Sequence, residues 1–515
     1  MPAAAWAAPT LRTLEGQTLD VPQTRIRELT ERPANKAGDF VLYWMTAFRR
    51  AHYNFSLQRA IEWAAELDKP LVILEALRCD YQWASDRLHR FVIEGMRDNA
   101  ADFSGQRLLY YPYLEEEQEG GKGLIRALTD RACVLVSDDF PCFFLPRMFK
   151  AVDKRIDVKF ELVDSNGLYP MRGADKVFSR AFDLRRHLQK ELLPHLAECP
   201  KRSPLQGYSL PELSNLPQEI TKKWSPADLD SALDGGEFLE QLPIDHDVRP
   251  GPIVGGSVAG RKRLTDFIDN KLDEYGELRN QPQEDAVSGL SPYLHFGHTS
   301  VHEVFETLSE RVGWNPSKVS GKANGARNGW WGLDESVEGF LDELVTWREL
   351  GLNMCSHRDD YDQYDSLPDW AQETLAEHAD DKREHTYTLE QFEQAKTHDE
   401  LWNAAQRQLV RDGAIHNYLR MLWGKKILHW SASPREALDI MIELNNKYAI
   451  DGRNPNSYSG IFWVLGRYDR PWGPEREIFG KIRYMTCDNT RRKVKVDGYL
   501  KKYSAGGRQT ELGFE

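Results

Sequence analysis

Apolar stretches of strand length alternate with helical stretches between residues 39 and 165, and this alternation constrains the fold more than any other feature. The expected strands are FVLYWMTA, PLVILEAL, RLLYYPYL, ACVLVSDDF and VKFELVDS. Three intervening stretches have helical periodicity, namely YNFSLQRAIEWAAELD, SDRLHRFVIEGMRDNAADF and PRMFKAVDKRID. Strands separated by helices of this length predict βαβ units and a parallel sheet.

The predicted sheet lacks the glycine motifs of nucleotide-binding proteins. No GxGxxG follows the first strand, and GxxxxGK[ST] occurs nowhere in the chain. We therefore expect the sheet to be a scaffold or to hold a different ligand.

Composition divides the chain into four parts. We expect a flexible N-terminal tail (1–37), an α/β domain (38–165), a linker rich in Pro, Gly and charge (166–255) and a helical domain (256–515). The predicted fold class is a Rossmann-like parallel α/β domain joined by a long linker to an all-α domain. Within the helical part, 313–332 is rich in Gly and Asn and predicts a loop or insertion, whereas SPREAL at 433–438 predicts a helix start.

The overall composition is typical of a soluble globular protein of two or three domains, with 515 residues, 41% hydrophobic and 29% charged. No apolar run is long enough to cross a membrane. The six cysteines are scattered without a CxxC pair, which argues against a metal site and against disulfides. We expect a protein that is not secreted, located in the cytoplasm of a bacterium or archaeon or in a eukaryotic nucleus.

A net charge of −13 disfavours indiscriminate binding to nucleic acid. Basic residues nevertheless gather near the C-terminus, in a basic island of Lys481, Arg483, Arg491, Arg492, Lys493, Lys495, Lys501 and Lys502. This island is suited to contact a phosphate backbone, and an ordinary solvated surface is the alternative.

Tryptophans are concentrated between residues 402 and 472. Trp423 and Trp430 are seven residues apart, so they share one face of a helix, and Trp402 opens the preceding helical stretch. Buried tryptophans mostly serve packing, and that is one interpretation of this tryptophan row (Trp402, Trp423 and Trp430). The other is a relay that carries an electron from solvent to a buried redox cofactor.

Two further patterns suit ligand binding. Glu343 and Trp347 lie four residues apart on one helix face, where an indole stacks on a flat ring and a carboxyl bonds its edge. The segment 288–300, SGLSPYLHFGHTS, places small residues and hydroxyls at a helix start, which favours a phosphate group. An ordinary amphipathic helix and a plain helix cap are the respective alternatives.

Several long motifs together resemble the class II cyclobutane pyrimidine dimer photolyases. They are SGLSPYLHFG, DELVTWREL, LWNAAQRQLV, RMLWGKKIL, LNNKYAIDGRNPN and FGKIRYM, and they occur in the family's order. The resemblance covers roughly residues 38 to 503 and includes the opening strand VLYWM. It implies an N-terminal α/β domain joined by a long linker to a helical domain that holds FAD.

The resemblance also implies roles for particular residues. It assigns FAD binding to Tyr275, Ser288, Gly289, Leu290, Ser291, Arg420, Asn445 and Asp451. Within that set, Arg420 and Asp451 form a charged pair beside the isoalloxazine, and Asn445 faces flavin N5, which gives it a catalytic role. It assigns the electron relay to Trp402, Trp423 and Trp430, and DNA contact to Arg279. It assigns the lesion pocket to Glu343, Trp347 and Trp463, and within that pocket it implies a catalytic role for the Glu343 carboxylate.

The implied activity is a carbon–carbon lyase that repairs cyclobutane pyrimidine dimers in DNA. A stacked dimer has to be flipped into a pocket, where reduced anionic FAD excited by light supplies an electron that splits the cyclobutane ring and then returns. We expect a monomer that acts on DNA, binds no metal and no membrane, and carries a second, antenna chromophore if one is present: a deazaflavin, a folate or another flavin.

The chain departs from the family pattern at Asn417, Leu419 and Leu422, and at Asn454, where an acid is usual. None of these positions carries an assigned role. Two other functions remain open: a cryptochrome-like photoreceptor that uses the same FAD and tryptophans, and a flavin-free DNA-binding relative. Glu343, Trp347 and Trp463 favour repair, since a sensor needs no dimer pocket.

Overall fold

The computed structural model describes residues 20–506 and groups them into two compact units. The first unit comprises residues 20–250, 254–270 and 288–357. The second comprises residues 251–253, 271–287 and 358–506. The predicted fold class is confirmed, because a mainly parallel α/β sheet forms the N-terminal part and helices form the C-terminal part. The domain boundaries expected from composition stay predictions.

The first unit is built around a six-stranded sheet with the order β1-β6-β5-β2-β3-β4. Its strands are β1 (Ile26–Glu28), β2 (Phe40–Met45), β3 (Leu71–Leu77), β4 (Leu109–Leu114), β5 (Ala132–Asp138) and β6 (Lys159–Val163). All pairs are parallel except β1 with β6, and Tyr43 in the central strand pairs with Ile73 and Val136. Five of the strands match the five expected from the sequence.

Strand β1 lies within the stretch 1–37, for which we expected a flexible tail. A buried arginine explains the order of residues 20–37. Arg25 ends the short helix η1 (Gln23–Arg25), is 1% exposed, and donates hydrogen bonds to the carbonyls of Gly167 and Leu168. Its guanidinium also lies 3.8 Å from the Asp164 carboxylate. Residues 1–19 of the expected tail lie outside the described residues.

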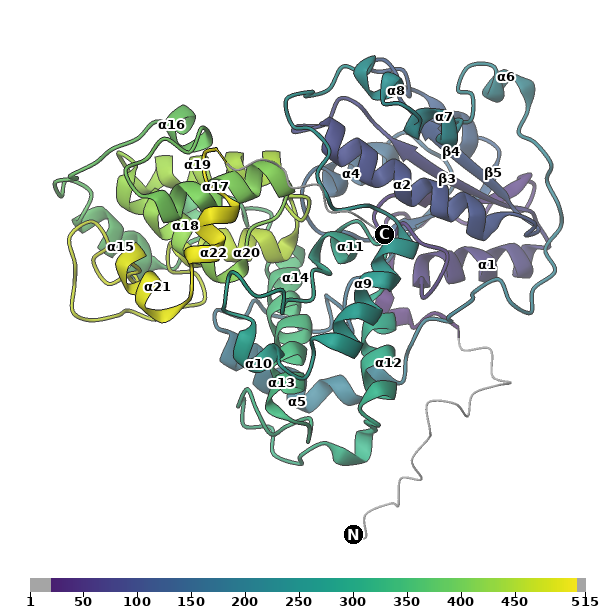
Figure 1. The fold of residues 1–515 in the computed structure, drawn as a ribbon. Coiled ribbons are helices and arrows are strands. Elements are labelled where there is room, and N and C mark those ends of the chain that lie inside the picture. Colours follow the sequence, from purple (N-terminus) through teal and green to yellow (C-terminus); the bar gives the residue numbers. More distant parts are fainter. Residues whose placement is uncertain (1–19, 507–515) are drawn as a thin grey trace, which may run out of the picture. The chain divides into compact units, whose positions relative to one another are not determined.

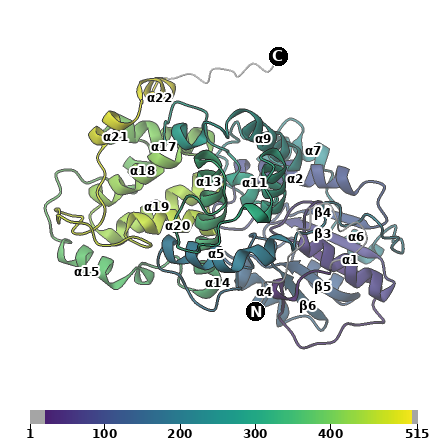
Figure 2. The ribbon, with the colours of Figure 1, turned by 90° about the horizontal axis from the view of Figure 1, so that it is seen from below.

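Alternate side chains of the strands build two apolar layers, as a period of two requires. Phe40, Leu42 and Trp44 pack on one face, where Phe149 of the helix α4 (Leu145–Asp153) joins them. Val41, Tyr43 and Met45 pack on the other face, and Figure 2 shows the sheet with α1 against it. The four helices between the strands are α1 (Phe55–Leu67), α2 (Asp86–Phe103), α3 (Leu124–Thr129) and α4 (Leu145–Asp153).

The order of strands reverses between β5 and β2, and open α/β sheets usually bind ligands at such a point. Here Asp138, the last residue of β5, occupies it. One carboxylate oxygen accepts the N–H groups of Thr46, Ala47 and Phe48 at 2.7–2.9 Å, and the other accepts the Tyr43 hydroxyl at 2.8 Å. The backbone donors that follow β2 are therefore satisfied by the protein itself.

The stretch 166–255, expected to be a surface connector, contains a long helix that the sequence analysis did not predict. Helix α5 (Ala181–Leu196) buries Leu184, Leu188 and Leu192, a four-residue spacing that gives it an apolar face. The short helices of this stretch are α6 (Gln218–Thr221), α7 (Leu229–Leu233) and α8 (Glu237–Glu240). Trp224 joins one apolar layer of the sheet, so this connector is packed against the α/β core.

The remaining helices of the first unit lead to residues 335–357. They are α9 (Ser257–Asn270), α11 (Ser291–His295), α12 (Val301–Arg311), α13 (Glu335–Leu341), the π-helical η3 (Asp342–Trp347) and α14 (Arg348–His357). The prediction of a loop at 313–332 is confirmed: the segment is irregular apart from η2 (Pro316–Lys318), and it buries Trp314, Trp330 and Trp331.

Helices make up the second unit. They are α10 (Tyr275–Leu278), α15 (Asp369–Glu377), α16 (Leu389–Glu393), α17 (Glu400–Asp412), α18 (Asn417–Trp430), α19 (Pro434–Tyr448), α20 (Pro455–Val464), α21 (Cys487–Lys493) and α22 (Asp497–Lys502), with the short η4 (Tyr364–Ser366). Helices α17 to α20 lie together as one group (Figure 1). Ser433 caps α19 and Pro434 opens it, as predicted. Among the described helices, none combines the length and the apolar character that a membrane span requires.

The loop that follows β6 packs against a buried acid. Glu349, 3% exposed, accepts the backbone N–H of Tyr169 at 3.2 Å. A Cβ atom on Gly167 would lie 2.2 Å from its carboxylate, so a larger residue there would displace the Glu349 side chain. Burial raises the pKa of Glu349 to about 7, with the nearby Asp164 contributing.

This raised pKa makes a testable contribution to stability. The folded chain binds the Glu349 proton more tightly than the unfolded chain does. The resulting contribution to the free energy of unfolding is therefore full below the ordinary pKa of a glutamate and is lost as pH rises through about 7. We expect Glu349→Gln to gain roughly 1–3 kcal/mol of unfolding free energy relative to the unsubstituted protein between pH 5 and pH 8. Urea unfolding at both pH values measures it. The exposed Glu310→Gln is the control, and an equal response of both variants contradicts the assignment.

Candidate functional site

Glu343 and Trp347 lie in a π-helical segment, η3, where the sequence predicts an ordinary helix. They are its two half-buried side chains, while Asp342, Leu344, Val345 and Thr346 are buried. That Glu343 and Trp347 share a face stays a prediction, and the i→i+5 bonding of the segment was not expected from the sequence. π-helical turns are rare and occur frequently at functional sites.

The segment 288–291 also belongs to the first unit and adopts a tight turn before α11. Gly289 has a φ of +64°, and a Cβ there would lie 2.6 Å from Nε of Arg263. That Nε donates to the Ser288 carbonyl at 2.7 Å. Arg263 thus places a positive charge beside the residues expected at the FAD phosphates. The predicted helix start is confirmed, with Pro292 in the first turn of α11.

The tryptophan row is buried in the second unit. Trp402, Trp423 and Trp430 are 0%, 2% and 4% exposed. The ring centroids of Trp402 and Trp430 lie 6.2 Å apart, and the Trp402 indole donates to the Trp423 backbone carbonyl at 3.0 Å. Trp430 also borders a cavity of about 220 Å³ with a mainly polar lining. Trp402 is therefore in contact with both of the other tryptophans. An isolated tryptophan that only fills space in the core would need no such contacts.

The charged pair assigned beside the isoalloxazine is formed. The Arg420 guanidinium lies 3.0 Å from one Asp451 oxygen and 3.4 Å from the other. The Arg420 Nε atom is buried and makes no hydrogen bond within residues 20–506. Asn445 is 2% exposed, and its amide nitrogen donates to Ser457 Oγ at 2.8 Å. An unused buried donor on Arg420 fits a bound group that supplies an acceptor.

Trp463 is half-buried near the end of α20, and a buried lysine binds the carbonyl next to it. The ammonium group of Lys425 donates to the Val464 carbonyl at 2.6 Å, where the negative end of the helix dipole favours a cation. Burial lowers the pKa of Lys425 to about 7. Asn454, where the family has an acid, caps the other end of α20 by accepting the Asn456 N–H at 2.9 Å.

Tyr275 and Arg279 occupy the short helix α10 and the residue that follows it. The Arg279 guanidinium lies 5.4 Å from the centre of the Tyr275 ring, and Tyr275 is 7% exposed. In the basic island, Arg491 forms ion pairs with Asp399 and Asp488, and Lys481 pairs with Glu475. Its other members are exposed. Of the remaining departures from the family, Asn417 is exposed, whereas Leu419 and Leu422 are buried.

The predicted site residues thus form two groups. The first unit contains Ser288, Gly289, Leu290, Ser291, Glu343 and Trp347. The second unit contains Tyr275, Arg279, Trp402, Arg420, Trp423, Trp430, Asn445, Asp451 and Trp463. Their assigned roles stay predictions. The sequence analysis missed several supporting residues, among them Lys425, Gln406 and Arg263; for Gln406, a position four residues after Trp402 on one helix was the available signal.

Gln406 provides a test of how the tryptophan row is fixed. Its Oε1 accepts the Trp423 indole N–H at 2.8 Å, and both residues are buried. We expect Gln406→Leu to lower the free energy of unfolding by roughly 1–3 kcal/mol, because the indole N–H loses its partner. Urea unfolding measures this, with the exposed Gln394→Leu as control. An unchanged midpoint for Gln406→Leu would contradict the arrangement.

Comparison with known proteins adds full-length relatives. A deoxyribodipyrimidine photo-lyase of Methanothermobacter thermautotrophicus is 32% identical over 481 residues, which cover 92% of this chain and 97% of the relative. A deoxyribodipyrimidine photo-lyase of Oryza sativa subsp. japonica is 35% identical over 479 residues, with 90% and 87% covered. No protein-family model matches the chain.

Solved structures share the fold at low identity. The cryptochrome of Synechocystis superposes with a TM-score of 0.65 at 14% identity, covering 90% of this chain and 88% of that one. At that identity the likeness concerns the fold alone.

Proposed function

The chain belongs to the deoxyribodipyrimidine photo-lyases and resembles their class II members, and from that premise we propose that it repairs cyclobutane pyrimidine dimers in DNA with light. The observation that carries the proposal is η3, which presents Glu343 and Trp347 as its two half-buried side chains. A carboxyl and an indole that are both partly accessible match the edge and the face of a flipped pyrimidine.

The residues fit FAD as the cofactor that the family implies. Arg420 offers a buried donor, Asp451 fixes its guanidinium, and Arg263 brings positive charge to the turn 288–291. When bound, reduced anionic FAD supplies the electron that light excites. The Asn445 side-chain amide nitrogen donates a hydrogen bond to the Ser457 hydroxyl. This orients the amide so that its side-chain oxygen faces a different partner. A second chromophore remains a proposal without assigned contacts.

Trp347 and Trp463 are proposed to receive the flipped bases. Each stacked base contributes roughly 1–3 kcal/mol, and the weakened pairing of a dimer lowers the cost of its extrusion. The Glu343 carboxyl is proposed to hydrogen-bond the pyrimidine edge, where its effect is strongest once water is excluded. Exposed lysines and arginines of the basic island, with Arg279, are proposed to contact the phosphate backbone.

The role of Glu343 is tested by truncating it. We expect Glu343→Ala to lower the repair yield per absorbed photon by roughly tenfold or more, because an interaction with the developing charge is lost. Flavin content and affinity for dimer-containing DNA should change little. The measurement is light-dependent repair of an oligonucleotide with one thymine dimer, with an absorption spectrum of the same sample. Glu335→Ala, an exposed acid at the start of α13, is the control. An undiminished yield for Glu343→Ala refutes the role.

The same assay separates the proposed substrate from its near relative. An oligonucleotide that carries one (6-4) lesion should remain unrepaired under the light dose that clears the thymine dimer. Equal repair of both lesions would overturn the proposed specificity.

The tryptophan row is proposed to reduce oxidised flavin. We expect Trp430→Phe to slow photoreduction several-fold, because phenylalanine is harder to oxidise, while repair by pre-reduced protein is retained. Trp472→Phe, a surface tryptophan that is 37% exposed, is the control. Photoreduction of Trp430→Phe at the unsubstituted rate would leave packing as the role of Trp430.

A photoreceptor function is the second candidate, and the buried tryptophan row favours it, because a sensor would use the same electron relay. Such a protein would photoreduce its flavin through the tryptophan row and leave dimers unrepaired. The repair assay therefore decides between the two.

A further inference from the structure

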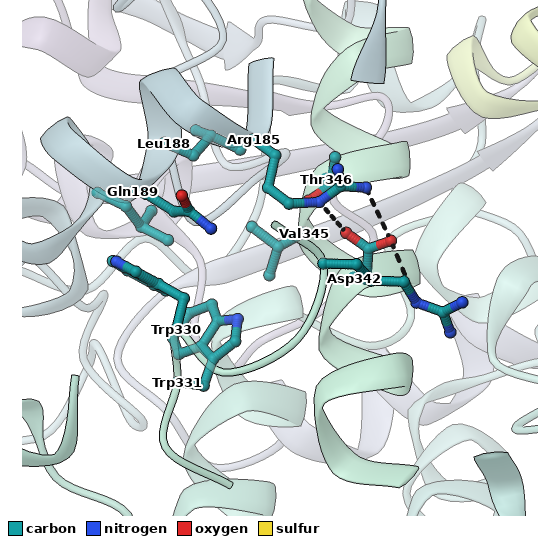
Figure 3. A pocket seen from close by; sticks show the side chains of 10 residues that line it. Arg185, Leu188, Gln189, Trp330, Trp331, Asp342, Val345 and Thr346 are labelled. Carbon is teal, nitrogen blue, oxygen red and sulfur yellow. Dashed lines mark hydrogen bonds and ion pairs between the residues drawn. The ribbon is translucent and has the colours of Figure 1, made fainter. Parts of the chain in front are cut away.

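Helix α5 supplies an arginine that binds the first residue of the π-helical segment. Arg185 extends from α5 toward Asp342, as Figure 3 shows. Its Nε lies 2.7 Å from one carboxylate oxygen and its terminal nitrogen 3.0 Å from the other. The side chains are 13% and 4% exposed, so this two-pronged ion pair is largely shielded from water.

Further contacts fix the arginine and the loop beside it. Arg185 also donates to the Gly325 carbonyl at 3.2 Å, and the Gln189 side chain exchanges hydrogen bonds with the backbone of Gly325 and Ala326. Arg327 of the same loop lies 3.8 Å from the second Asp342 oxygen. The cavity between these groups is only about 20 Å³, which leaves room for little more than one water. The contact region between α5, the loop 325–327 and Asp342 is therefore closely packed and is not a ligand site.

Asp342 is the first residue of η3, so its ion pair with Arg185 affects how Glu343 and Trp347 are oriented. A π-helix is a rare alternative to the α-helix, so surrounding contacts have to hold its register. A change of one residue in register rotates a helical side chain by about 100°. Glu343 follows Asp342 directly, and Trp347 ends the segment. An anchored Asp342 therefore fixes the direction in which Glu343 extends relative to Trp347.

We propose that Arg185 is a positioning residue for repair: by holding Asp342, it keeps η3 in the register that presents Glu343 and Trp347 together. This inference rests on the proposed function, since it assigns Arg185 an effect through Glu343. It also gives a catalytic purpose to a helix in the stretch that the sequence presents as a connector.

The test compares substitutions at Arg185 with a neighbouring control. Arg185→Met keeps the apolar stem and removes the charge, whereas Arg185→Lys keeps the charge and removes the planar fork. Arg180→Ala removes an exposed arginine that directly precedes α5 and pairs with Asp183 in the first turn of that helix. For each variant the measurements are repair yield per photon at saturating dimer DNA, DNA affinity, flavin content, photoreduction rate and melting temperature.

We expect Arg185→Met to lose roughly tenfold in repair yield, as small misplacements of reacting groups do. Arg185→Lys should recover part of that loss, and Arg180→Ala should match the unsubstituted protein. Photoreduction should stay unchanged in all three, because the hydrogen bonds and ion pairs described for Arg185 and Asp342 join α5, η3 and the loop 325–327 and not the tryptophan row. Asp342→Asn should reproduce the loss, and its combination with Arg185→Met should add nothing further.

Each alternative outcome has a separate meaning. A repair yield of Arg185→Met equal to that of the unsubstituted protein overturns the inference alone. Losses of yield, flavin and melting temperature in parallel, in both Arg185→Met and Arg185→Lys, overturn it in favour of a purely structural role. If Arg185→Met does not fold, Arg185→Lys decides, because an unchanged yield there also overturns it. Unsubstituted protein without repair activity overturns the proposed function, and the inference with it.

Discussion

Buried carboxylates that bind partners from distant segments hold the functional parts of this molecule in place. Asp342 fixes the start of η3 through Arg185, and Glu349 joins the following helix to the loop after β6. Burying a charge is unfavourable unless it is paired or hydrogen-bonded, so each of these groups makes a specific geometry the stable one. Apolar packing alone tolerates small shifts, whereas a two-pronged ion pair does not. The π-helical segment therefore has one such group at its first residue, Asp342, and another, Glu349, two residues after its last.

Much of this fold follows from local sequence patterns. The five parallel strands are predictable because their residues are apolar and bounded by turns, and α19 because Ser433 and Pro434 mark its start. Helix α5 has a regular leucine spacing, but the prolines and glycines elsewhere in the stretch 166–255 are typical of a connector, and that was the prediction. The π-helical hydrogen bonding of η3 leaves no local signal, because its sequence DELVTW is an ordinary amphipathic one. Its first residue is bound by Arg185, 157 residues away in the chain, and a tertiary contact of this kind can override local preference.

The sequence predicts which residues belong to the candidate site. It does not predict the neighbouring residues that hold them in place. Tryptophan spacing placed Trp423 and Trp430 on one face, but only the fold brings the Trp402 ring beside Trp430. The roles of Asn445, Arg420 and Asp451 came from resemblance, since none of them belongs to a motif with its own chemistry. Gln406 and Lys425, which bind Trp423 and the residue after Trp463, act through hydrogen bonds that sequence spacing does not specify.

The carboxylate of Asp138 has a consequence for the α/β domain. Nests of backbone amides at the end of a parallel sheet attract anions, and dinucleotide-binding proteins use them to seat a pyrophosphate. In this chain an internal anion already sits there, on the N–H groups of Thr46, Ala47 and Phe48. An incoming phosphate would meet negative charge where other sheets offer positive charge. The domain therefore has the strand order of a sheet that binds a ligand at this point, while its own Asp138 occupies the backbone N–H groups there.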